Sequence, residues 1–197
     1  MKSINKYLVL FTMFFICTLS SFAQTEHMKF MGIPITGSMI DIEKKLEEKG
    51  FVYKIEFSEG DTTNIIREYE GIFTGSKVSV YVVSDYDIVW KIEVKYPDYN
   101  SFSAIEKDYK TMVKQYSIKY GDKIEHYEFF NDSTKLLDDY DKLQQLEDGQ
   151  CHYLSGWELE NGNISIRIAS DLSLRISYED AENLKRTEAY SRIQDDI

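Results

Sequence analysis

The stretch that decides the fold runs from Ile88 to Tyr96 and reads Ile-Val-Trp-Lys-Ile-Glu-Val-Lys-Tyr. Its apolar residues Ile88, Trp90, Ile92, Val94 and Tyr96 alternate with Val89, Lys91, Glu93 and Lys95. Successive side chains of a β-strand point to opposite faces, so this alternation predicts a strand with one apolar and one polar side. Such strands are typical of an antiparallel sheet that rests on a core through one face. We therefore expect Trp90 in the core.

Similar alternation elsewhere predicts further strands. Together they cover residues 51–57, 65–74, 77–84, 88–96, 123–130, 150–159, 163–169 and 172–178. Tight-turn residues at 74–77 and 85–87 connect neighbouring strands, and this predicts hairpins.

Helical spacing appears before each group of strands. Met39, Ile42 and Leu46 recur at helical intervals after Ser38, which forms a predicted capping box with Asp41. A second apolar stripe predicts a helix over residues 102–120, beginning near Ser101 or Ser103 and ending at Gly121. If it begins at Ser103, Glu106 would complete its capping box. Residues 135–147 resemble a short charged helix, and the polar tail over 181–197 is also expected to be helical.

Two segments of the chain resemble each other. Residues 78–85 match residues 164–171 in pattern and in three identities. We interpret this as an internal repeat, although any two amphipathic hairpins look alike. The expected fold is α+β, with two units of one helix plus a four-stranded antiparallel sheet and the helices on one face. The units would span residues 24–100 and 101–180.

The N-terminus has the pattern of a secretory signal peptide. Lys2 and Lys6 precede an apolar stretch over residues 8–22, and small residues lead to a cleavage site after Ala23. Cys17 lacks the small residue that a lipid-anchor site needs before it. We expect residues 1–23 to be removed and the protein to be periplasmic or extracellular. The remaining 174 residues hold one cysteine, Cys151, which excludes an internal disulfide.

The charge of the chain restricts its partners. The 174 residues carry 21 Lys and Arg against 34 Asp and Glu, a net charge of −13. Nucleic acids and anionic membranes attract clustered basic residues, so neither is an expected partner. No apolar run after residue 23 approaches the length of a membrane span.

Two resemblances add to this interpretation. The first is carried by the opening Phe30, Gly32, Pro34, Gly37 and Ser38, by Ala23-Gln24 and by the closing Ile176, Tyr178 and Asp180. In these the chain resembles small uncharacterised exported proteins of anaerobic gut bacteria, which implies export but no activity. The paired layout of a helix and four strands is similar to that of beta-lactamase inhibitor proteins. That similarity would imply protein binding across a sheet face, but it transfers no residue.

Catalytic candidates are few. Cys151 and His152 are neighbours in a strand, so their side chains point to opposite faces and cannot bond to each other. Cys151 shares its side with Tyr153 and Trp157, which favours a buried, inert thiol. His126 could reach Cys151 from a neighbouring strand. We predict no catalytic residue and no cofactor-binding residue, because no phosphate-binding loop, dinucleotide fingerprint or nucleophile elbow is present.

Metal and modification motifs are also weak. The three histidines are far apart in sequence, and the acidic run at 138–148 lacks the pattern of a calcium loop, with Leu143 at a ligand position. No metal ligand is predicted. Residues 61–63 and 132–134 resemble a short O-glycosylation acceptor.

The polar side of the sheet is the remaining candidate site. Alternation places on it Lys54, Glu56, Glu68, Glu70, Tyr81, Lys91, Glu93, Lys95, Ser165, Arg167, Ser173, Arg175 and Ser177. Opposite charges on adjacent strands stabilise a sheet without any binding role. Tyr and Arg are, however, frequent anchors of protein interfaces. The predicted partner-binding residues are Tyr81, Lys91, Glu93, Arg167 and Arg175.

These features predict a non-catalytic binding or envelope-accessory protein rather than an enzyme. Its partner would be an unknown protein or envelope component. The alternative is a secreted hydrolase acting on glycans or peptides, which needs a deep pocket with convergent titratable groups. A purely structural envelope protein would have neither a pocket nor a binding face.

Overall fold

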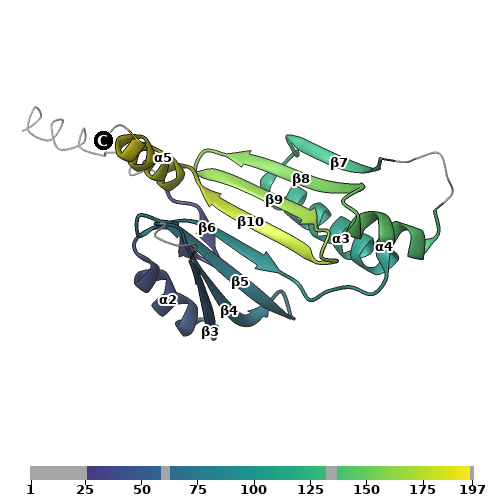
Figure 1. Ribbon diagram of the computed structural model, residues 1–197, viewed down its shortest axis with the longest axis horizontal. Helices are drawn as coiled ribbons and strands as arrows, with labels where there is room; N and C mark the ends of the chain where they lie inside the picture. The colour runs from purple at the N-terminus through teal and green to yellow at the C-terminus, as the bar shows by residue number, and fades with distance from the viewer. Residues whose placement is uncertain (1–25, 59–62, 132–136, 196–197) are drawn as a thin grey trace, which may run out of the picture.

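The computed structural model describes residues 26–58, 63–131 and 137–195. Its main feature is one sheet of eight strands in the order β3-β4-β5-β6-β10-β9-β8-β7 (Figure 1). The strands are β3 (Val52–Ser58), β4 (Ile65–Phe73), β5 (Ser76–Asp85), β6 (Ile88–Lys95), β7 (Glu125–Phe130), β8 (Cys151–Leu159), β9 (Gly162–Ile168) and β10 (Leu174–Asp180). Each neighbouring pair is antiparallel. The short strands β1 (Lys29–Phe30) and β2 (Ile33–Pro34) form a separate hairpin.

The predicted layout of two units, each of one helix plus a four-stranded sheet, is wrong, although the fold is broadly α+β. Strands β6 and β10 pair along their length, with Val94 opposite Ile176 and Ile92 opposite Tyr178. This pairing joins the strands into one sheet. The physical reason is that an unpaired strand edge leaves backbone N–H and C=O groups exposed. Pairing β6 with β10 satisfies both edges and merges their apolar sides into one core.

The described residues form four helices. They are α2 (Met39–Glu48), α3 (Phe102–Tyr120), α4 (Asp139–Glu147) and α5 (Ala181–Asp195). The predicted capping box of α2 is confirmed, because Ser38 and Asp41 each accept the other's backbone N–H. Helix α3 begins after Ser101, whose hydroxyl accepts the Ala104 N–H. The alternative start at Ser103 is wrong, since Ser103 lies inside the helix.

Helices α2 and α3 pack on the same side of the sheet. Residues that lie opposite each other on successive strands share one side of the sheet. One such row runs through Tyr69, Val80, Val94, Ile176, Ile166 and Ser155. At one end of this series, Glu43 of α2 pairs with Arg67, which is two residues from Tyr69 on β4. At the other end, the Tyr109 hydroxyl of α3 lies 2.8 Å from Ser155 Oγ. We call this side the helix face and the opposite side the open face; Figure 1 shows α3 behind β8–β10.

The N-terminal hairpin completes the core on the helix face. Phe30 is fully buried, and its ring contacts those of Phe51, Phe73 and Tyr178, which come from both halves of the sheet. The strands predicted from sequence begin at residue 51, so this hairpin is not among them.

Helices α4 and α5 fix the ends of other elements. Asp139 of α4 accepts the backbone N–H groups of Phe102 and Ser103 and so caps α3. In α5, the buried Asn183 side chain donates to the carbonyl oxygens of Ile35 and Val89. Both helices therefore hold segments that are distant in sequence.

Two irregularities in strand register reverse predicted side-chain directions. The register between β3 and β4 shifts between Tyr53 and Ile55, so that Glu56 lies opposite Arg67 on the helix face. Glu56 was predicted on the polar side, and this assignment is wrong. A second shift, between Val83 and Ser84, leaves Trp90 half-buried while Val89 is fully buried. The prediction that Trp90 lies in the core is wrong for the same reason.

Several predictions fall outside the described residues. They are the signal peptide over 1–23 and most of the two glycosylation-like motifs, at 61–62 and 132–134. Among the described helices, none combines the length and the apolar character that crossing a membrane requires.

Candidate functional site

The open face of the sheet gathers the polar residues that sequence analysis singled out. Tyr81 on β5 lies opposite Glu93 on β6, and Glu93 lies opposite Ser177 on β10. Arg175 on β10 lies opposite Arg167 on β9. The five predicted partner-binding residues therefore share one face, across the four central strands.

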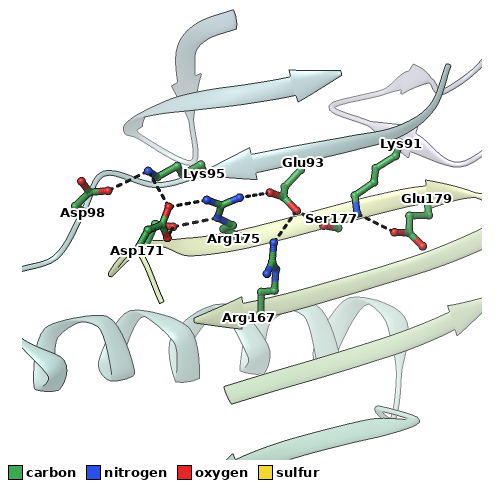
Figure 2. Close-up of polar contacts among 10 residues, drawn as sticks. Lys91, Glu93, Lys95, Asp98, Arg167, Asp171, Arg175, Ser177 and Glu179 are labelled. Atoms are coloured by element: carbon green, nitrogen blue, oxygen red, sulfur yellow. Dashed lines mark hydrogen bonds and ion pairs between the residues drawn. The ribbon is translucent and has the colours of Figure 1, made fainter. Parts of the chain in front are cut away.

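Glu93 is the centre of an ionic network (Figure 2). Its carboxylate accepts hydrogen bonds from Arg175 Nη1 at 2.7 Å, from Ser177 Oγ at 3.0 Å and from Arg167 Nη2 at 3.3 Å. Only 10% of the Glu93 side chain is exposed. A buried carboxylate is costly unless its charge is compensated, and here two guanidinium groups compensate it. Burial alone would raise the pKa of Glu93, but the Arg175 hydrogen bond and the two positive charges outweigh burial and lower it.

The network continues along the open face through Asp171. Its carboxylate accepts from Arg175 Nη2 at 2.6 Å and from Lys95 Nζ at 3.0 Å. Burial would raise the pKa of Asp171, but hydrogen bonds from Ser173, Arg175 and Lys95 hold it well below its ordinary value. Beside this network, Lys91 Nζ and Glu179 Oε1 form a separate ion pair at 3.1 Å (Figure 2).

The five predicted residues differ in how far they are committed to this network. Arg175 is 23% exposed in its side chain and bonds to both Glu93 and Asp171. Arg167 is 43% exposed and makes one long contact to Glu93. Arg167 therefore keeps guanidinium donors directed toward solvent, whereas Arg175 and Glu93 form the framework beside it.

A second feature of the open face is an aromatic shelf that sequence analysis missed. We use this name for Tyr127 and Phe129 on β7 together with His152 and Leu154 on β8. Register places Tyr127 opposite Leu154 and Phe129 opposite His152, with the last two ring centres 4.9 Å apart. Tyr127 and Phe129 are nearly half exposed. The shelf and Arg167 line one open hollow of about 410 Å³.

The aromatic shelf reverses the usual pattern of a sheet. On β7 the aromatic Tyr127 and Phe129 lie on the open face, while His126 and Glu128 lie on the helix face. Alternation alone predicts that apolar side chains point to the core. The sequence does show that aromatic and polar residues alternate along β7. This alternation does not state which of the two sides faces the helices.

A second open hollow, of about 420 Å³, lies at the other half of the open face. It is lined by Tyr81, Glu68, Glu70, Lys77 and Lys95, among others. Further toward this edge, β3 and β4 expose apolar side chains on the same face. They are Val52, Ile55, Phe57 and Ile72.

The cysteine candidate does not assemble into a catalytic pair. Cys151 is buried beside Tyr153 on the helix face, as predicted, and burial together with the charge of Glu106 raises its pKa to about 12. His126 lies on the same face but contacts Ser155, with Nδ1 3.0 Å from the hydroxyl oxygen. A thiol with a raised pKa, whose candidate base His126 contacts another residue, is a poor nucleophile.

Within the described parts of the chain, no three His, Cys, Asp or Glu residues are grouped so that they could hold a metal ion. The acidic residues near 138–148 have structural roles instead. Asp138 accepts the Asp141 N–H and caps α4, and Asp139 caps α3. No protein-family model, curated protein or solved structure matches this chain, so the resemblances drawn from its sequence remain predictions.

Proposed function

We propose that this protein is a non-catalytic binding module that holds a protein partner on the open face of its sheet. The observation that carries the proposal is the position of Arg167, a half-exposed guanidinium beside the aromatic shelf. Aromatic residues and arginine are enriched at protein interfaces, and tyrosine and arginine are frequent among the residues that dominate the binding energy.

The ionic network supports this role by giving Arg167 one orienting contact. Glu93 is held by Arg175 and Ser177 and in turn contacts Arg167 Nη2. A side chain that is ordered before binding loses less conformational entropy when the partner arrives. The partner expected here presents an apolar side chain to the shelf and a carboxylate to Arg167, since guanidinium pairs well with carboxylates.

The alternative of a hydrolase has less support. A carboxyl group that acts as a general acid needs a pKa raised toward neutrality. On the open face the opposite shift occurs, because arginine and lysine partners lower the pKa of Glu93 and Asp171. These shifts are typical of structural ion pairs.

The proposed location is the periplasm or the cell exterior, because residues 1–23 have the pattern of a signal peptide. The partner would then be another exported protein or a component of the cell envelope. N-terminal sequencing of protein from the culture medium or periplasm is expected to begin at Gln24, and intact protein in the cytosol would contradict this location.

Capture of partners from envelope and medium fractions tests the proposal. The wild-type protein and the Arg167→Ala variant serve as baits, with Lys107→Ala as a matched control that removes one positive charge from the exposed side of α3. We expect Arg167→Ala to lose a protein that both other baits retain. Loss of at least 1–2 kcal/mol, about tenfold in Kd, is typical of an interface anchor. Equal retention by all three baits would contradict a role for the open face.

A further inference from the structure

Strand β7 is an outer strand of the sheet and is exposed along most of its length. Among the described strands, β8 is its only neighbour, and residues 125–129 are all exposed. Its register with β8 runs from Glu125 to Phe130 without a shift. Outer strands are usually protected from pairing by a bulge, a proline or a lysine. Strand β7 contains none of these three and has only the charges of Glu125 and Glu128, whereas the opposite outer strand β3 has both a register shift and Lys54.

The backbone direction along β7 follows from its ladder. Asn131 N–H donates to the Gln150 carbonyl at 2.9 Å, in the register that β7 and β8 share. Residue pairs in an antiparallel ladder alternate between hydrogen-bonded and non-hydrogen-bonded. Phe129 and Tyr127, two and four residues before Asn131, therefore also direct their N–H and C=O groups toward β8. His126 and Glu128 direct theirs away from β8, toward the outside of the sheet.

We infer that β7 pairs with β7 of a second copy of this chain, in antiparallel register about Tyr127. The residues with outward backbone then lie opposite each other, His126 of one copy beside Glu128 of the other, twice by symmetry. His126 Nε2 already lies 3.5 Å from Glu128 Oε1 of its own strand, and in the pair each imidazole can also donate a hydrogen bond to the facing carboxylate. A register centred on Glu128 would place two like charges opposite each other, and this disfavours it.

The result would be a sheet of sixteen strands with two open faces side by side. A two-fold axis perpendicular to the sheet keeps equivalent faces on the same side, so the two aromatic shelves would meet at Tyr127. The inference does not rest on the proposed function, because backbone pairing at an outer strand needs no partner on the open face.

Disulfide trapping tests both the pairing and its register. In a background without Cys17 and Cys151, Tyr127→Cys introduces a thiol opposite its own copy, and Phe129→Cys is the matched control on the same strand and face. Facing Cβ atoms lie about 5 Å apart in such a pair. The two Phe129 positions would be four residues out of step, about 14 Å apart, too far for a disulfide. We expect Tyr127→Cys to form a disulfide-linked dimer under mild oxidation, at least about tenfold more than Phe129→Cys.

A charge exchange provides an independent measurement on protein that keeps its native cysteines. Sedimentation velocity is expected to show a reversible dimer, its loss in His126→Glu, and its recovery in the double variant His126→Glu with Glu128→Lys. Far-ultraviolet circular dichroism checks that each variant is folded. A wild-type protein that stays monomeric up to about 0.5 mM would overturn the inference. So would equal trapping of both cysteine variants, or trapping of Tyr127→Cys only to a different protein.

Discussion

At the scale of single residues, Arg175 and Arg167 lie on one face but differ in what they stabilise. Truncation by Arg175→Ala removes the closest partner of the buried Glu93 carboxylate and one partner of Asp171. We expect it to lower the free energy of unfolding by about 2 kcal/mol, since an uncompensated buried charge is costly. Arg167→Ala removes one long contact of an exposed side chain and is expected to cost about 0.5 kcal/mol or less.

Urea denaturation of both variants measures this difference. Equal stability of the two variants would mean that Glu93 does not depend on Arg175. Sequence alone could place both arginines on the polar side, because the residues that alternate with them along β9 and β10 are apolar. It could not separate them, because burial depends on which strand lies opposite, and the pairing of β6 with β10 was not predicted.

The ionic network also makes stability depend on pH. The folded-state pKa values of Glu93 and Asp171 are lowered. Their contribution is therefore fully present above the unfolded-state values, about 4 for both. It is lost as the pH falls through the lowered folded-state values.

We expect the free energy of unfolding to decrease as the pH falls below about 5, and to do so less steeply in Arg175→Ala, whose carboxylates have lost a partner. Urea denaturation between pH 3 and pH 6 compares the two slopes (a range chosen around the ordinary carboxyl pKa values, roughly 4). Parallel slopes would show that the pH dependence comes from other carboxyl groups.

At the scale of elements, Gly71 decides how β4 passes over Phe51. A Cβ atom at Gly71 would lie 2.3 Å from the Phe51 ring, which is buried in the core. We expect Gly71→Ala to destabilise the protein by about 1–3 kcal/mol through overpacking. The matched control is Gly156→Ala on β8, where the new Cβ would make ordinary contacts of 3.6 Å.

Thermal melting followed by circular dichroism compares the two glycine variants. If the Gly71→Ala and Gly156→Ala proteins melt at the same temperature, Phe51 moves aside without cost and the expectation is wrong.

The spans of the elements could be predicted well from sequence, and their irregularities could not. Periodicity located the helix after Ser38 and its capping box, because spacing and capping are local properties. The register shifts near Tyr53 and Val83 depend on the partner strand, so they reversed Glu56 and moved Trp90 out of the core. The aromatic shelf was missed for a related reason, because alternation on β7 does not say which side the helices cover.

At the scale of the whole molecule, the pairing of β6 with β10 makes one continuous core. Buried residues of the five adjacent strands β5, β6, β10, β9 and β8 belong to the same apolar cluster, and Phe30 contacts both halves of the sheet. We therefore expect one cooperative unfolding transition, with Ile176→Ala on β10 lowering its midpoint without splitting it. The expected cost of this truncation is about 3 kcal/mol.

Calorimetry together with hydrogen exchange of β5 and β8 measures this cooperativity. Two transitions, or loss of protection in one half alone, would contradict a single core. The two-unit layout predicted from sequence would have given separate transitions. Local patterns describe hairpins, but they contain no information on which outer strands of two hairpins meet.

The claim central to this account is that the open face of the sheet is the surface that holds a partner. Photo-crosslinking in the producing cells tests it most directly, with a benzophenone amino acid placed at Tyr81 or His152 on the open face, or at Lys107 on α3. We expect the two open-face positions to capture the same partner, Arg167→Ala to reduce this capture, and the Lys107 position to capture none of it. Capture of the same partner from Lys107, or open-face capture that Arg167→Ala leaves unchanged, would contradict the account.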